Sequence, residues 1–260
     1  MKAQVLLPKV FNFPFTYNSK IKIKIGDIVE VPFGSKKEIG VIWKNKYQEP
    51  ENIKIKEISK KTNYSIDKKL VDFIEWFSIY NMVPIGLVLK MVIGSADKFI
   101  KKNDNPIELK ETKSQKYILS KEQVSALRFL EKTKNKFEVS VLQGTTGSGK
   151  TLIYFERIKK IIKEKKQALV LLPEIFLTND FKLRFEDFFG FEPAIWHSKI
   201  TPKQKRIIWK GIISNKIQIL VGARSALLLP FQKLGIIIVD EEHDTSYKQD
   251  EGVIYNARDM

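Results

Sequence analysis

Hydrophobic and polar residues alternate through the first sixty residues of the chain. The alternation is clearest over Ile21–Ile25 and Val29–Phe33, and two more short apolar runs follow at Ile39–Trp43 and Ile53–Ile58. A period of two is typical of β-strands. Because these runs are short and close together, we expect a small barrel or a twisted sheet.

Residues 67–93 have a different period. Apolar side chains from Leu70 to Phe77 follow the i, i+3, i+4, i+7 spacing of an amphipathic helix. Pro84 breaks this helix, and a second helix is expected over Ile85–Val92. Residues 95–117 are polar and charged, which predicts a linker.

After residue 118, short β-rich runs alternate with helical stretches such as Leu152–Lys165 and Pro202–Ser214. Near-continuous apolar strands between helices predict a parallel sheet covered on both faces. The expected fold class is therefore α/β, with a β-rich domain over residues 1–94, a linker over 95–117 and one parallel-sheet lobe over 118–260. The predicted strands of the lobe are Val139–Leu142, Ala168–Leu172, Ala194–Trp196, Ile217–Val221 and Ile236–Val239.

The chain is strongly basic, with 46 lysines and arginines against 30 acids and a net charge of +16. Such a charge favours a polyanionic partner, of which nucleic acid is the commonest. A lysine-rich surface from a biased genome is the alternative, because only six of the basic residues are arginines.

The absence of cysteine excludes disulfides, thiolate zinc sites and cysteine nucleophiles within this chain, and two histidines are too few for a histidine-rich metal site. The N-terminus lacks the apolar core of a signal peptide, and no apolar run approaches the ~20 residues that span a bilayer. We expect a cytoplasmic protein with no membrane partner.

A glycine-rich run matches the pattern G-x-x-x-x-G-K-[ST] and lies between an apolar run and a helical stretch. Glycines let backbone N–H groups close around phosphates, and the start of a helix adds its positive dipole end. Lys150 would neutralise the β- and γ-phosphates, and the Thr151 hydroxyl would bind Mg²⁺. A purely structural turn would not need Lys-Thr after it. The predicted nucleotide loop comprises Gly144, Thr145, Thr146, Gly147, Ser148, Gly149, Lys150 and Thr151.

Two acids, Asp240 and Glu241, follow the apolar run Ile236–Val239. Ligands of open α/β sheets bind at this carboxyl edge. Asp240 would hold Mg²⁺ through its water shell, and Glu241 would orient and deprotonate the attacking water. Two acids after a strand are often just the N-cap of a helix. Because a phosphate loop lies upstream in this chain, we interpret them as catalytic residues. The predicted catalytic residues are Lys150, Asp240 and Glu241, and the metal ligands are Thr151 and Asp240.

These motifs resemble those of superfamily 2 helicases, because Asp240–His243 is a variant of their DExH box. The wider strings resemble the PriA family of bacterial replication-restart helicases. They are DEEHDTSYKQDEG, LLPEIFLT (171–178), WHSKIT (196–201) and VGARSALLLPF (221–231).

The resemblance implies a RecA-like lobe, ATP-driven 3′→5′ DNA unwinding and primosome assembly at stalled forks, with ATP and Mg²⁺ as cofactors. It also implies that Gln123 reads the adenine edge and that His243 belongs to the nucleotide site. The implied partners are forked and single-stranded DNA with a free 3′ end, single-strand-binding protein and other primosome proteins.

Four short N-terminal motifs resemble the domain of the same family that captures the 3′ end of a nascent strand: Phe15–Tyr17, Val31–Gly34, Ile39–Val41 and Pro84–Gly86. That match implies a pocket in which an aromatic ring stacks on a terminal base, a glycine permits close approach and a lysine meets a phosphate. The alternative is that Phe15 and Gly34 are ordinary core and turn residues. The implied pocket residues are Phe15, Thr16, Gly34 and Lys54.

Further DNA contacts are implied in the lobe. Arg224 and Ser225 follow a predicted strand and would contact a single-stranded backbone. Tyr247 and Lys248 lie in a loop that resembles the family's aromatic-rich loop, which links DNA occupancy to hydrolysis. Arg224 and Arg258 are the arginines expected near the carboxyl edge of the parallel sheet.

The family normally has parts that this chain lacks. The segment between residues 94 and 120 is too short for a winged-helix domain, and a second RecA-like lobe and eight zinc-binding cysteines would follow residue 260. We therefore expect an N-terminal fragment of a longer helicase, with zinc only in the missing part. The alternatives are a fork-binding module without ATP turnover and a double-stranded DNA translocase of the same superfamily.

Overall fold

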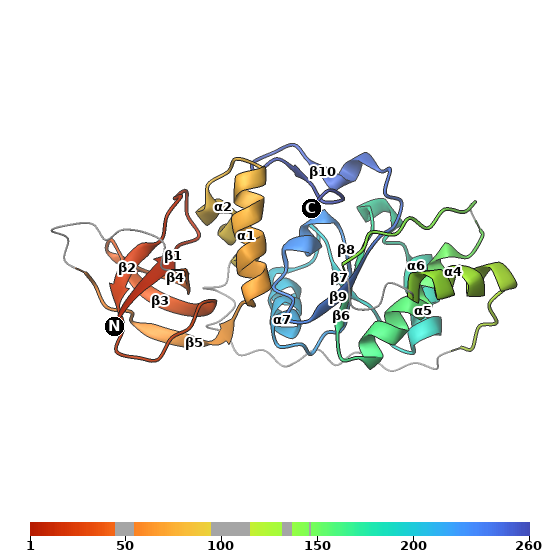
Figure 1. Ribbon diagram of the computed structural model, residues 1–260, viewed down its shortest axis with the longest axis horizontal. Coiled ribbons are helices and arrows are strands. Elements are labelled where there is room, and N and C mark those ends of the chain that lie inside the picture. The colour runs from red at the N-terminus through yellow and green to blue at the C-terminus, as the bar shows by residue number, and fades with distance from the viewer. Residues whose placement is uncertain (45–54, 95–114, 132–136, 146) are drawn as a thin grey trace.

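The computed structural model describes residues 1–44, 55–94, 115–131, 137–145 and 147–260. A β-rich N-terminal part is followed by a part with a parallel sheet and flanking helices, as in one RecA-like lobe (Figure 1). The predicted fold class is confirmed. No helix in these ranges is long and apolar enough to cross a membrane.

The N-terminal part is a five-stranded antiparallel sheet in the order β2-β1-β4-β3-β5. The segment before β5 joins it to β2, because the Asn18 N–H donates to the Lys56 carbonyl at 2.8 Å and the Ile58 N–H donates to the Asn18 carbonyl at 2.9 Å. These bonds bring the two edges of the sheet together and curve it. The strands are β1 (Lys2–Leu6), β2 (Phe15–Asn18), β3 (Asp27–Phe33), β4 (Lys36–Ile42) and β5 (Lys60–Ser65).

One strand predicted for this part is wrong. Ile21–Ile25 is irregular, with a bend at its start and a turn at its end, because the side chains of Ser19 and Asp27 accept hydrogen bonds from its backbone N–H groups and compete with a strand ladder. The run Ile53–Ile58 lies partly outside the described residues, and its described part is not a strand. Among the described residues, the next strand is β5.

In the described residues of the second part, one sheet has four parallel strands in the order β7-β8-β6-β9, and β10 (Lys248–Gln249) pairs with β11 (Tyr255–Asn256) in a separate hairpin. β6 is buried throughout, and its alternate residues face opposite layers: Val170 packs with helices α5 and α6, whereas Leu169 shares a cluster with α7. The elements are α4 (Lys121–Glu131), α5 (Lys150–Lys163), β6 (Gln167–Leu171), α6 (Asn179–Phe189), β7 (Ala194–Trp196), α7 (Pro202–Ile213), β8 (Ile219–Gly222) and β9 (Leu234–Val239).

The predicted strand Val139–Leu142 is not present. Val139 is 77% exposed and Val141 is 89% exposed. Strands are stabilised by cross-strand partners, and within the described ranges β9 pairs with β6 alone. The phosphate loop therefore follows an irregular segment rather than a strand.

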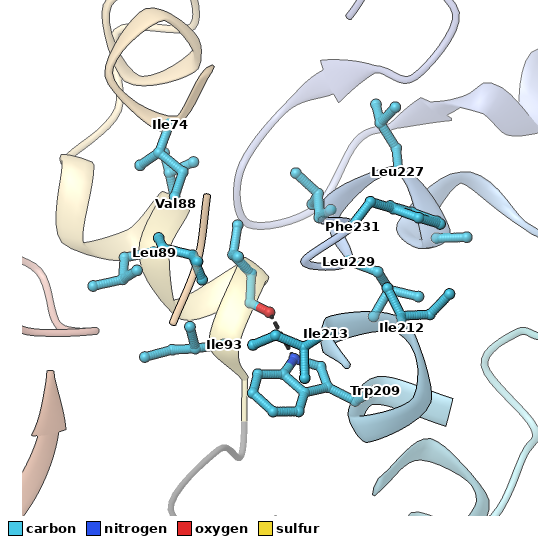
Figure 2. Close-up of a cluster of buried hydrophobic side chains, with 14 of the residues drawn as sticks. Ile74, Val88, Leu89, Ile93, Trp209, Ile212, Ile213, Leu227, Leu229 and Phe231 are labelled. Carbon is cyan, nitrogen blue, oxygen red and sulfur yellow. Dashed lines mark hydrogen bonds between the residues drawn. The ribbon is translucent and has the colours of Figure 1, made fainter. Parts of the chain in front are cut away.

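The two parts share one hydrophobic core. Helices α1 (Lys68–Tyr80) and α2 (Ile85–Ile93) pack against α7 and the short helix η2 (Arg224–Leu228), as Figure 2 shows. The indole N–H of the buried Trp209 donates to the Val92 carbonyl at 3.3 Å, and its ring contacts Tyr64 edge to face at 5.7 Å. The sheet that carries the predicted 3′-end pocket is thus joined to the predicted nucleotide-binding lobe by packed side chains.

Candidate functional site

The predicted phosphate loop leads directly into α5, although Thr146 lies outside the described residues. Lys150 is the first residue of α5, and its ammonium donates to the carbonyl oxygens of Gly144 at 2.6 Å and Thr145 at 3.3 Å. The first N–H groups of a helix have no partner within it and attract anions. The free N–H groups at the start of α5 can therefore bind phosphate oxygens. The Lys150 ammonium can do the same if it exchanges its two carbonyl partners for phosphate.

Gln123, on α4, lies against this loop. Its side-chain amide donates to the Ser148 carbonyl at 3.0 Å and accepts from the Ser120 N–H at 2.9 Å. Gly149 has a left-handed φ of 81°, and a Cβ there would lie 2.4 Å from the Gln123 amide nitrogen. Gln123 thus holds the loop in position, and its contact with adenine stays a prediction.

Asp240 and Glu241 follow β9, at the carboxyl edge of the sheet. Both carboxylate oxygens of Asp240 accept hydrogen bonds: Oδ1 from the Glu241 N–H at 3.1 Å, and Oδ2 from the Tyr154 hydroxyl at 2.9 Å. Burial, followed by the nearby Asp240 carboxylate, raises the pKa of Tyr154 well above its usual value. Tyr154 therefore stays protonated near neutral pH and acts as the donor.

A second tyrosine holds the backbone of the same acid. The Tyr247 hydroxyl lies 2.6 Å from the Asp240 carbonyl and 2.9 Å from the Leu171 carbonyl, and so joins the ends of β6 and β9. Tyr247 was predicted to contact DNA. Its side chain is only 1% exposed, so the structure places it in the core and the predicted direct contact needs correction.

Glu241 has an unusual backbone conformation. Its φ is +49°, in the left-handed region that costs a residue other than glycine roughly 1–3 kcal/mol and often marks functional sites. The His243 Nε2 lies 3.7 Å from a Glu241 carboxylate oxygen, and the His243 side chain is exposed. The place of His243 in the nucleotide site stays a prediction.

A pocket of about 240 Å³ lies beside these acids. Thr151 from α5, Asp240 and Glu241 line it together with Arg184 from α6. A hydroxyl and carboxylates are the oxygen ligands that Mg²⁺ prefers, so the groups present fit a metal bound with a nucleotide. Arg184 was not among the arginines expected at this edge, which were Arg224 and Arg258. Its position on α6, the helix that follows the LLPEIFLT string, is the sequence feature that could have indicated it.

The residues predicted to contact DNA in the lobe differ in accessibility. Ser225 and Lys248 are exposed. The Arg224 guanidinium instead donates to the Ser246 carbonyl at 3.1 Å and to the Lys248 carbonyl. Arg224 therefore supports the segment that follows the acidic motif, and its contact with DNA stays a prediction.

In the N-terminal part, the structure brings Phe15 and the Gly34 turn together. The ring of Phe15 on β2 lies 5.2 Å from that of Phe33, the residue before Gly34. Gly34 has a φ of +60°, and no atom lies within 4 Å of the place where a Cβ would stand. An open glycine turn therefore borders an aromatic ring, as the predicted pocket requires.

The other two predicted pocket residues are Thr16 and Lys54, and the structure describes only Thr16. The Thr16 hydroxyl accepts a hydrogen bond from Gln4 at 3.1 Å. Lys54 lies outside the described residues. Lys56, two residues further along the same lysine-rich run, donates from its ammonium to the Gly34 carbonyl at 3.3 Å. Sequence reasoning missed Lys56, because alternate lysines in this run have no distinguishing neighbours.

The predicted nucleotide loop, the acidic pair and the parallel sheet are the features of a P-loop nucleotide-binding lobe. The sequence model described as DEAD/DEAH box helicase matches residues 120–260, and the chain belongs to this family. A second sequence model, described as 3'DNA-binding domain (3'BD), matches residues 4–94.

Curated relatives carry the name Replication restart protein PriA. The protein of Rickettsia felis is 41% identical over 265 residues, which cover 99% of this chain and 40% of the relative. That of Helicobacter pylori is 35% identical over 252 residues, covering 95% and 38%. The Bacillus subtilis protein is 42% identical over 144 residues, covering 55% and 18%. The chain thus spans about two fifths of the length of the first relatives.

Proposed function

We propose that this chain is the part of a replication-restart helicase that captures the 3′ end of a nascent strand and binds ATP with Mg²⁺. In the whole protein these parts would serve 3′→5′ unwinding and primosome assembly at stalled forks. The shared core carries the proposal, because α1 and α2 attach the sheet bearing the open Gly34 turn directly to the lobe with the phosphate loop. The helicase family and the names of the relatives support it.

The nucleotide chemistry is assigned to residues of the lobe. Lys150 would exchange its carbonyl contacts for β- and γ-phosphate oxygens, while Thr151 and Asp240 would hold Mg²⁺. The metal supplies neutralising charge at the phosphates. Glu241, which lines the same pocket, would orient and deprotonate the attacking water.

The 3′ end is assigned to the N-terminal part. Phe15 would stack on the terminal base, and Gly34 would allow the terminal sugar to approach the backbone. Lys54, which lies outside the described residues, keeps its proposed contact with a phosphate, and Lys56, whose ammonium donates to the Gly34 carbonyl, would supply a second lysine there. Forked DNA, single-strand-binding protein and other primosome proteins are the partners that we propose, in the cytoplasm.

Fluorescence anisotropy with labelled forks tests this proposal. We expect the 260-residue chain to bind a fork with a free leading-strand 3′-hydroxyl more tightly than the same fork ending in a 3′-phosphate, because the proposed pocket has room for a terminal sugar and an added phosphate would crowd that sugar. Lys150→Ala serves as the control, since it removes a nucleotide contact and leaves the DNA pocket intact. Equal affinities for the two forks at matched salt would refute the assignment of a 3′-end reader.

A further inference from the structure

Phe15 belongs to a cluster of four phenylalanine rings, the phenylalanine cluster, that extends beyond the proposed pocket. Phe11 and Phe13 come from the loop between β1 and β2, Phe15 from β2 and Phe33 from β3. Neighbouring ring centroids lie between 5.0 and 5.9 Å apart, in edge-to-face or tilted contacts. Phe13 contacts Phe11 and Phe15, and it forms the outer end of the row Phe33–Phe15–Phe13.

The loop that carries Phe13 is fixed to the fold. The Phe11 carbonyl accepts a hydrogen bond from the Gly86 N–H at 3.0 Å, at the start of α2. A Cβ on Gly86 would lie 2.1 Å from the Lys9 carbonyl, so the close contact between loop and helix requires glycine. Phe13 is nevertheless 46% exposed. An aromatic ring is thus held in place while much of its surface remains open to solvent.

Lysines surround the phenylalanine cluster. The Lys9 ammonium lies 5.6 Å from the centroid of Phe33, and Lys36 pairs with Phe33 across the β3–β4 hairpin. Lys56 lies at the adjoining Gly34 turn. Two acids are also present, since Glu38 pairs with Lys9 at 3.0 Å and Glu30 with Lys37 at 3.3 Å. Aromatic rings among excess lysines are the combination that binds single-stranded nucleic acid, through stacking on bases and attraction of phosphates.

We propose that Phe13 stacks on the second base from the 3′ end, so that the site requires at least two unpaired nucleotides. This inference rests on the proposed function, which places the terminal base at Phe15. The Phe13 and Phe15 centroids are 5.2 Å apart. Neighbouring nucleotides are ~3.4 Å apart when stacked and reach this spacing by modest extension of the strand. The occupant is therefore the continuation of the same strand.

The test pairs a substitution with a missing base. Phe13→Ala in the full chain should weaken binding about tenfold to a fork with two unpaired 3′-terminal nucleotides, because a stacked base contributes about that factor. On a fork whose second nucleotide is abasic, the wild type should lose the same factor and Phe13→Ala should bind as the wild type does. Phe13→Leu keeps an apolar contact with Phe11 and Phe15 but removes the π face, and it should behave like Phe13→Ala.

Controls separate stacking from a general loss of fold. Phe129→Ala removes another exposed phenylalanine, on α4 in the lobe, and should leave DNA binding unchanged. The thermal unfolding midpoint of each variant is measured alongside.

Two results would overturn the proposal for Phe13: wild-type affinity in Phe13→Ala or Phe13→Leu on the intact fork, or an equal loss on the intact and abasic forks. The first is also the result expected if the phenylalanine cluster docks a protein instead. If the wild type does not distinguish a 3′-hydroxyl from a 3′-phosphate, the proposed 3′-end reader fails, and the abasic comparison still decides the role of Phe13.

Discussion

Replacing Tyr154 with phenylalanine removes one hydroxyl from the nucleotide site and keeps the buried ring. In the structure that hydroxyl donates to Asp240 Oδ2 at 2.9 Å. It therefore contacts one of the two residues proposed to hold Mg²⁺. After the substitution, the Asp240 carboxylate keeps, among the described residues, the bond from the Glu241 N–H to Oδ1. We expect Asp240 to lose its fixed orientation.

The size of the effect follows from these contacts. A hydrogen bond to a charged group contributes about 1.5–3 kcal/mol to stability. Asp240 is half-buried, so water recovers part of this, and we expect the free energy of unfolding to fall by about 1–2 kcal/mol. A freed carboxylate also distributes among its staggered rotamers. The affinity for Mg²⁺–nucleotide should therefore fall about three- to tenfold, because ordering the side chain now opposes binding.

Titration of a fluorescent ATP analogue, with Mg²⁺ and with a chelator, separates positioning from general damage. Tyr154→Phe should weaken binding only with Mg²⁺, because the phosphate-loop contacts are unchanged. The raised pKa keeps Tyr154 protonated below about pH 10, where its contribution is complete, so the difference from wild type should be constant between about pH 6 and 9.

Tyr255→Phe is the matched control. Tyr255 is also buried, and in the described part of the chain its hydroxyl has no hydrogen-bond partner. Its removal should leave Mg²⁺–nucleotide binding unchanged. Equal losses with and without Mg²⁺ in Tyr154→Phe, or no loss at all, would contradict the positioning of Asp240 by Tyr154.

Three further predictions concern the proposed function. In the full-length enzyme, Lys150→Ala should abolish ATP hydrolysis and leave fork binding largely intact. Normal ATP turnover by this variant would contradict the assignment of residues 144–151 as the phosphate loop. The isolated chain should hydrolyse ATP close to background in a phosphate-release assay, because an arginine from across the cleft contributes ~10³–10⁵ in rate in related enzymes; strong DNA-stimulated turnover by the monomer would disprove this. Lys56→Ala should weaken 3′-end binding and flatten its salt dependence, while Lys165→Ala, on the lobe, should change neither.

Secondary structure was predicted correctly where the pattern of the segment and its immediate neighbours decides it. Leu169 and Val170 lie in an apolar run too short for a helix and flanked by helical patterns, and that run forms the buried strand β6. Val139–Leu142 is also short and mostly apolar but is not a strand, because strand formation depends on a partner and not on composition alone. Ile21–Ile25 failed for another reason, since side chains beside it bind its backbone N–H groups.

The residues of the candidate site also fall into two groups, those that a continuous motif predicts and those that only the packing brings together. The phosphate loop and Asp240 were predicted because each motif is continuous in sequence. Tyr154 was not, since its partner Asp240 is 86 residues away and only the packing of α5 against the sheet brings them together. Lys56 was missed because nothing in its lysine-rich segment distinguishes it from the neighbouring lysines, and Arg184 because the helix that carries it follows the LLPEIFLT string and belongs to no motif.

The burial of Tyr247 changes how the predicted aromatic-rich loop can link DNA to hydrolysis. A tyrosine that holds the Asp240 carbonyl cannot also stack on DNA. The Phe77 ring of α1 lies 5.4 Å from that of Tyr255, whose strand pairs with residues 248–249 directly after Tyr247. Close-packed side chains have few alternative arrangements. The packing therefore places α1 against the short hairpin that follows Tyr247, the residue whose hydroxyl contacts the backbone of the acid that the proposed function assigns to Mg²⁺.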